Sequence, residues 1–190
     1  RFVDKLLRPK VPWAEKLRSS MMKVAGRDAT TWVKLNRRRL ITQGVIMPGY
    51  TGHGAGHIVF AVDTSGSMSD NEIAQGLSEC DKILTDCMPQ AVTLIGCDAK
   101  VDTVHELYSG DHLCEQDLPR LGGGGGTSFI PPFEYVEKEF ITPACLVYFT
   151  DMFGPFPEYT PGYPVIWCST TEDQVAPFGE TIFVKFDKDE

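Results

Sequence analysis

The chain has 190 residues and a formal net charge of −8, and 42% of its residues are hydrophobic. This length predicts a single domain, and the near-average composition excludes wholesale disorder and collagen-like repeats. The six cysteines show no CxxC spacing and mostly lie in apolar runs, so we expect reduced thiols rather than a disulfide framework or a zinc site. No segment approaches the roughly 20 apolar residues of a membrane-spanning helix.

Charge is divided unevenly along the chain. Residues 1–50 carry 12 Lys and Arg against 3 Asp and Glu, whereas residues 51–190 carry 6 against 23. We therefore predict two parts: a basic, partly helical N-terminal extension over residues 1–50 and the main domain over residues 51–190. Because the chain begins at Arg1, we expect the extension to be a linker from a preceding domain or the C-terminal remnant of one. The acidic main domain makes nucleic acid an unlikely partner, since phosphate contacts need Lys and Arg.

The extension contains one clear helical pattern. Apolar residues recur at spacings of four, four and three from Trp13 to Val24, which predicts a helix over residues 13–25. Residues 30–41 are mixed in character and include three consecutive arginines. The glycine-rich residues 48–57 predict a loop or a hairpin tip.

From residue 58 onward, apolar runs of strand length alternate with helical patterns. Helices are predicted over residues 70–88 and 129–140. Strands are predicted over residues 58–62, 91–97, 101–107, 144–149, 164–168 and 181–186. The alternation predicts a three-layer α/β fold with helices flanking a mainly parallel central sheet, and residues 101–107 pair back on their predecessor as an antiparallel edge strand.

Polar residues cluster where these elements meet. Asp63, Ser65 and Ser67 follow the first strand, Asp151 follows the strand over residues 144–149, and Thr127 precedes the second helix. In parallel sheets, ligands bind beyond the carboxyl ends of the strands, so we expect the three loops to meet there. Two carboxylates with neutral hydroxyls and waters suit Mg²⁺ or Mn²⁺ and leave the ion open to a carboxylate from a partner.

The DTSGS motif at 63–67, Thr127 after a glycine run and Asp151 after an apolar strand resemble the metal-ion-dependent adhesion site (MIDAS) of von Willebrand factor A (VWA) domains. The resemblance covers about residues 56–190 and implies a Rossmann-like fold that binds a partner's Asp or Glu through the metal. Carried over to this chain, the residues that hold the metal, directly or through water, are Asp63, Ser65, Ser67, Thr127 and Asp151.

A narrower resemblance rests on WVKLNRR at 32–38, GGGGGT at 122–127 with FIPPFEY at 129–135, and APFGET at 176–181. These segments are similar to a bacterial and phage group in which a VWA-like domain follows a metallopeptidase-like domain. The resemblance implies a cytoplasmic protein and a MoxR-type AAA+ ATPase as a partner. Ser128 stands where members often carry Asp, and we expect it to be a helix N-cap. The chain has no HExxH motif, so any peptidase activity would belong to other residues.

Three functions remain open at this level. The first is a metal-dependent interaction module that is not itself an enzyme. The second is a metal-assisted hydrolase, which the residues disfavour because Ser65 replaces the second Asp of dehalogenase-type phosphatases and no GxSxG elbow is present. The third is a metal-free scaffold, which is indicated by Ser128, because it stands where members of the group often carry Asp.

We expect structural rather than functional roles for the other polar residues. We expect His53 and His57 in a loop, and His105 and His112 at surface or turn positions. Asp98 and Asp102 are expected to be solvated residues of a hairpin turn. We expect Arg37–Arg39 to lie against the acidic domain or a neighbouring domain, and nucleic-acid binding through this basic run is a weaker alternative.

Overall fold

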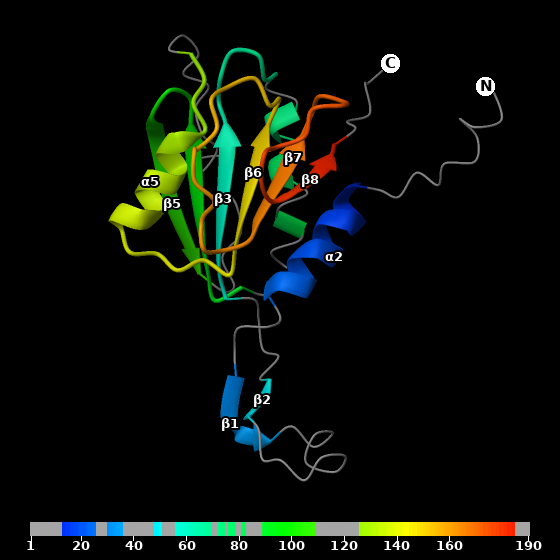
Figure 1. The fold of residues 1–190 in the computed structure, drawn as a ribbon, viewed down its shortest axis with the longest axis vertical. Helices are drawn as coiled ribbons and strands as arrows, with labels where there is room; N and C mark the ends of the chain where they lie inside the picture. The colour runs from blue at the N-terminus through cyan, green and yellow to red at the C-terminus, as the bar shows by residue number, and fades with distance from the viewer. Residues whose placement is uncertain are drawn as a thin grey trace, which may run out of the picture.

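The computed structural model describes residues 13–25, 30–35, 48–50, 56–69, 72–74, 76–78, 81–82, 89–108 and 126–184. Its centre is a six-stranded sheet with the order β5-β4-β3-β6-β7-β8 (Figure 1). The strands are β3 (His57–Asp63), β4 (Ala91–Cys97), β5 (Val101–Tyr108), β6 (Cys145–Thr150), β7 (Val165–Ser169) and β8 (Glu180–Phe183). Neighbouring strands pair in parallel except β5, which pairs antiparallel with β4 at the edge. The predicted sheet is therefore confirmed, including its antiparallel edge strand.

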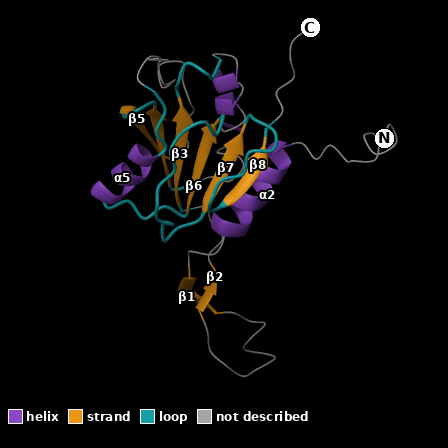
Figure 2. Cartoon of the chain, turned by 45° about the horizontal axis from the view of Figure 1, so that its top comes forward, coloured by secondary structure: helices purple, strands orange, loops and turns teal. Residues whose placement is uncertain are grey.

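Helices cover both faces of this sheet (Figure 2). On one side lie α2 (Trp13–Ala25) and helical residues at 72–74, 76–78 and 81–82. On the other side lies α5 (Ile130–Lys138), which begins with two prolines in its first turn, where their missing N–H groups cost nothing. The three-layer architecture agrees with the prediction, and the rest of the helix expected over 70–88 lies outside the described residues.

The helix α2 packs on one face of the sheet and contributes to the hydrophobic core. Leu17 and Met21 are fully buried, in one cluster with Phe60 and Phe149. The Trp13 ring meets the Phe149 ring edge-on, with 5.8 Å between the centroids. The basic extension thus contributes a core helix, while the boundary at residue 50 stays a prediction.

The face under α5 is aromatic. Trp167 on β7 lies at the centre of this cluster, and the Tyr148 ring of β6 stacks on it at 5.1 Å. The rings in contact with Trp167 are Phe129, Phe133, Tyr148, Phe156 and Phe178. This packing fixes the start of α5 against the carboxyl half of the sheet, because Phe129 directly precedes the helix.

A separate two-stranded antiparallel sheet joins β1 (Thr30–Leu35) and β2 (Pro48–Tyr50). Neither strand is predicted from the sequence, and the loop or hairpin tip expected over 48–57 is wrong for residues 48–50. The signal for β1 was present, since Thr-Thr-Trp-Val is a run of β-branched and aromatic residues with high strand propensity. The arginine run and the loop at 51–55 lie outside the described residues.

Cysteines 97, 145 and 168 are free and buried, as predicted, and burial raises the pKa of the Cys97 thiol to about 12. The other three cysteines lie outside the described residues. Among the helices described, none combines the length and apolar character needed to cross a bilayer.

Two adjacent methionines on α2 test whether this helix belongs to the core. Met21 is fully buried and Met22 is 56% exposed. We expect Met21→Ala to lower the free energy of unfolding by about 2–5 kcal/mol, because a buried side chain leaves a cavity. Met22→Ala makes the same change of residue on the same helix and should cost less than about 1 kcal/mol. Urea unfolding followed by circular dichroism measures both, and equal losses would contradict the packing of α2.

Candidate metal centre

Parallel pairing brings the ends of β3 and β6 together. Val62 pairs with Phe149, so the next residues, Asp63 and Thr150, leave the ladder side by side. The arrowheads of β3, β6 and β7 point to the same edge in Figure 1. The loops after β3 and β6 therefore start from one place, as the sequence predicted.

The loop after β3 is a tight turn held by its own side chains. Asp63 is fully buried, and its Oδ1 accepts the Ser65 N–H at 2.9 Å. The Ser65 and Ser67 hydroxyls are hydrogen-bonded to each other at 3.0 Å. Carboxylate and hydroxyl oxygens of all three residues are thus gathered by this turn.

Thr150 joins this turn to the end of β6. Its hydroxyl donates to Asp63 Oδ2 at 2.9 Å and accepts the Met152 N–H at 3.0 Å. Thr150 was not among the site residues predicted from the sequence. The available signal was a single hydroxyl at the last position of a buried apolar strand, directly before Asp151.

Asp151 lies in a constrained turn after β6. It is 5% exposed, and its Oδ1 accepts the Phe153 N–H at 2.9 Å. Met152 between them is buried and has a φ of 69°, a left-handed conformation that costs a non-glycine residue about 1 kcal/mol or more. The Phe153 N–H thus fixes one oxygen of the Asp151 carboxylate in this turn.

Thr127 is held against the same turn. A Cβ on Gly154 would lie 3.1 Å from Thr127 Cγ2 and 3.1 Å from the Phe129 ring. The Phe129 N–H also donates to the Pro155 carbonyl at 3.1 Å. The absence of a side chain at Gly154 therefore sets how closely the Thr127 loop approaches the Asp151 turn.

The other side of this loop contacts the end of β4. The Ser128 N–H donates to the Asp98 carbonyl at 3.0 Å. Gly126 has a φ of 91°, which only glycine adopts easily. Ser128 was expected to be the N-cap of α5, and this is wrong, because the N-cap is Phe129. The Ser128 hydroxyl nevertheless accepts the Ile130 N–H at 3.4 Å.

The electrostatics of the site centre on Asp63. Burial raises the pKa of its carboxyl above the ordinary value of 3.8, and the Asp151 carboxylate adds to the rise. Hydrogen bonds from Ser65 and Thr150 favour the charged form and oppose that rise. A buried, ionised Asp63 is therefore costly, and a nearby cation would reverse the cost.

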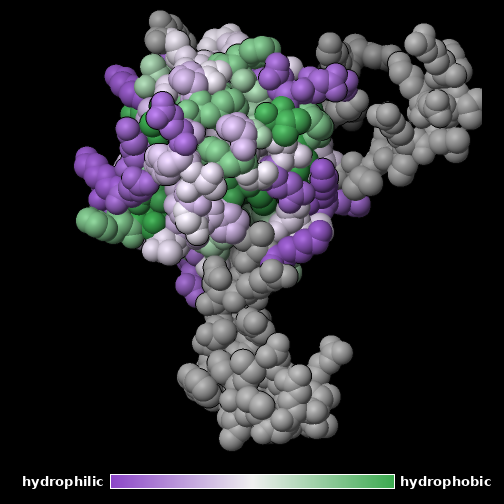
Figure 3. Space-filling model, viewed as in Figure 1, coloured by the Kyte–Doolittle hydropathy of each residue, from purple (hydrophilic) through white to green (hydrophobic). Residues whose placement is uncertain are grey.

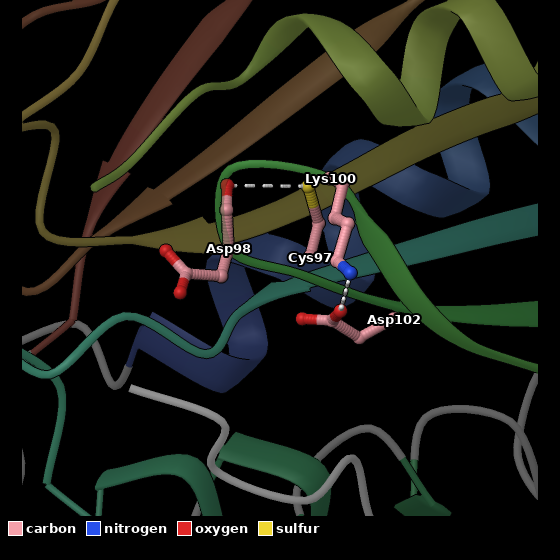
Figure 4. Close-up of polar contacts among 4 residues, drawn as sticks. All are labelled: Cys97, Asp98, Lys100 and Asp102. Atoms are coloured by element: carbon pink, nitrogen blue, oxygen red, sulfur yellow. Dashed lines mark hydrogen bonds and ion pairs between the residues drawn. The ribbon is translucent and has the colours of Figure 1, made fainter. Parts of the chain in front are cut away.

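The expected solvated turn at Asp98 is wrong. Asp98 is 5% exposed. Its N–H donates to the Lys100 carbonyl, and its own carbonyl accepts the Ser128 N–H. In Figure 4 its carboxylate points away from Lys100 and Asp102, which form an ion pair at 4.0 Å, and its carbonyl accepts a weak hydrogen bond from the Cys97 thiol at 3.5 Å. Asp102 is exposed, as expected, but it lies in β5 and not in the turn.

The predicted loop position of His57 is also wrong. His57 begins β3, and its Nε2 is hydrogen-bonded to the Thr93 hydroxyl at 2.7 Å, while burial lowers its pKa. It therefore lies at the opposite end of β3 from Asp63. His105 is in the middle of β5, and His53 and His112 lie outside the described residues.

The donor set fits a small, hard cation. Within the described residues, no three His, Cys, Asp or Glu side chains form a group that could hold a metal. The predicted set differs in kind, because three of its five side chains are neutral hydroxyls. Hard oxygen donors of low total charge suit Mg²⁺ or Mn²⁺, which retain waters, rather than Zn²⁺. The residues that could hold such an ion are Asp63, Ser65, Ser67, Thr127 and Asp151.

The raised pKa of Asp63 predicts a gain in stability for Asp63→Asn in EDTA. In the wild type the folded state keeps its proton above pH 3.8, so stability falls as pH rises through the folded pKa. Asparagine does not ionise; its Oδ1 can still accept the Ser65 N–H, and its Nδ2 can donate to the Thr150 hydroxyl oxygen once that hydroxyl turns its own proton away. We expect its advantage in free energy of unfolding to be present at pH 7 and to shrink toward pH 3. A variant less stable than wild type at pH 7 would contradict this.

Comparison with known proteins agrees with this architecture. The crystal structure of the ArnB paralog VWA2 from Sulfolobus acidocaldarius matches with a TM-score of 0.50 and 17% identity, over 65% of this chain. The match spans 37% of that protein, and at this identity it shows the fold alone. No curated protein sequence matches the chain significantly. The profile of the VWA-like domain (DUF2201) matches residues 58–185, and the chain therefore belongs to this family.

Proposed function

We propose that the protein is a metal-ion-dependent interaction module that binds Mg²⁺ or Mn²⁺ and captures a carboxylate of a partner protein. VWA-like folds commonly mediate protein interactions. The observation that carries the proposal is the hydrogen-bonded set in which Asp63 contacts both Ser65 of its own turn and Thr150 of a distant strand. The metal ligands in this proposal are Asp63, Ser65, Ser67, Thr127 and Asp151.

The two aspartates and the two serines have different roles in this mechanism. Asp63 and Asp151 supply two negative charges, and Thr150 and the Phe153 N–H orient them. The Ser65 and Ser67 hydroxyls can rotate their protons away and present lone pairs. When bound, the cation supplies a Lewis-acidic position for a carboxylate oxygen from Asp or Glu of the partner.

The resemblance of the chain suggests its setting. We place the protein in the cytoplasm of a bacterium or phage-infected cell, behind a metallopeptidase-like domain. A MoxR-type AAA+ ATPase is the proposed partner. We propose no catalysis by this chain, because the described histidines, His57 and His105, lie within β3 and β5, away from the proposed ligands.

A metal-free scaffold is the second candidate, and one observation favours it. Both oxygens of Asp63 already accept hydrogen bonds, and burial raises the pKa of this carboxyl. Both oxygens would then have hydrogen-bond donors from the chain itself, and the fold could be complete without a cation. In that case partner binding would be indifferent to EDTA.

Thermal unfolding across a Mg²⁺ and Mn²⁺ titration, after EDTA treatment, separates the two candidates. A ligand at 100 times its dissociation constant adds about 2.7 kcal/mol to the stability of the folded state. For a chain of this size that corresponds to roughly 5–10 °C in Tm. We expect this rise in the wild type and in the Asp102→Ala control, and its loss in Asp63→Ala. An equal response of wild type and Asp63→Ala would leave the scaffold as the function.

Gly154 offers a second test from outside the ligand set. Gly154→Ala places a Cβ 3.1 Å from Thr127 Cγ2, so the Thr127 loop must shift. Changes around metal ligands typically cost about 10–100-fold in affinity, and we expect about 10-fold weaker Mn²⁺ binding by electron paramagnetic resonance. Gly162→Ala is the matched control, because a Cβ there meets no atom within 4 Å. Unchanged affinity in Gly154→Ala would remove Thr127 from the proposed site.

A further inference from the structure

An exposed aromatic side chain lies beside the candidate site. Phe153 is 59% exposed, and Asp151 Oδ1 accepts its backbone N–H at 2.9 Å. The other exposed large hydrophobic residues in the described part of the chain are Met22, Phe140, Tyr108, Tyr159, Val175 and Phe183. None of these lies within two residues of a proposed metal ligand, so Phe153 is distinguished by its position.

The backbone holds Phe153 outward. Met152 turns its own side chain into the core with a φ of 69°, and its N–H is bound by the Thr150 hydroxyl. On the other side, Gly154 packs between Thr127 and Phe129. The two neighbours of Phe153 are thus held by contacts with the protein interior, and Met152 adopts a strained backbone conformation there. Backbone strain of this kind is concentrated at ligand-binding turns.

The negative charge of the main domain explains why a carboxylate partner would need an apolar contact as well. Residues 51–190 carry 23 acidic against 6 basic residues, and hydrophilic side chains form patches on both sides of the face in Figure 3. The two charges of a divalent cation are matched by Asp63 and Asp151. A carboxylate partner therefore meets a repulsive field beyond the ion, and a strongly acidic partner would be repelled most.

We propose that Phe153 is a specificity contact for a protein segment with one Asp or Glu next to an apolar side chain. The carboxylate reaches the cation, and the apolar side chain packs on the Phe153 ring, which is 59% exposed. Aromatic anchors of this kind dominate many protein interfaces. The inference rests on the proposed function, whose metal site supplies the carboxylate contact.

Selection from a random dodecapeptide phage library tests the inference. The immobilised protein is panned in Mg²⁺, and bound phage are released with EDTA. Wild type, Phe153→Ser and the matched control Phe140→Ser are compared. Phe140 is 91% exposed and follows α5, where the chain runs toward the amino end of β6 at the opposite edge of the sheet.

From the wild type and Phe140→Ser we expect peptides with one Asp or Glu and an apolar residue within two positions. From Phe153→Ser we expect the carboxylate without the apolar preference, and about 10-fold weaker binding of wild-type-selected peptides. The Mg²⁺-induced rise in Tm is measured on the same three proteins.

Three results would overturn the inference and leave the proposed function standing: carboxylate peptides with no apolar enrichment, peptides rich in several acidic residues, or an apolar preference that survives in Phe153→Ser. Loss of the Mg²⁺-induced rise in Phe153→Ser would also overturn it, since Phe153 would then act through the metal site. Recovery of no EDTA-released carboxylate peptide from the wild type would overturn the proposed function itself, and the inference with it.

Discussion

The parallel register of β3 and β6 is the constraint on which the candidate site depends. It places Asp63 and Thr150 side by side at the carboxyl edge of the sheet, where they form a 2.9 Å hydrogen bond. The serines follow Asp63, and the turn that carries Asp151 and Phe153 follows Thr150. A slip of one residue between these strands would turn Asp63 and Thr150 to opposite faces and separate the whole set.

Packing and chemistry are coupled through this edge. The aromatic cluster around Trp167 seats Phe129, and Phe129 in turn positions the Thr127 loop against Gly154. The same turn that buries Met152 exposes Phe153. A small number of rigid contacts therefore connects the core under α5 to the polar groups that would meet a cation.

The sequence predicts the architecture well because its signals there are strong. Buried strands are continuous apolar runs, and DTSGS at 63–67 is a recognisable turn after one of them. The missed features depend on tertiary contacts. Asp98 is a turn residue by pattern, and its contact with Ser128, 30 residues later, leaves no local signal in the sequence. Thr150 gains its role only because β6 inserts beside β3, and no local pattern reports that pairing. The β1–β2 sheet was missed because a short two-stranded ribbon leaves only a weak propensity signal.

The bond between Thr150 and Asp63 joins residues 87 positions apart, and this distance bears on how the protein folds. Contacts between remote parts of a chain must overcome a large loop-closure entropy, so chains rich in them fold slowly. A nascent chain that has emerged only as far as β5 already contains Asp63, Ser65 and Ser67, but it lacks the strand that orients them. The oxygen cluster therefore assembles only after β6 has been synthesised, and a cation that selects it would bind molecules with a formed β3–β6 pair in preference to shorter nascent chains.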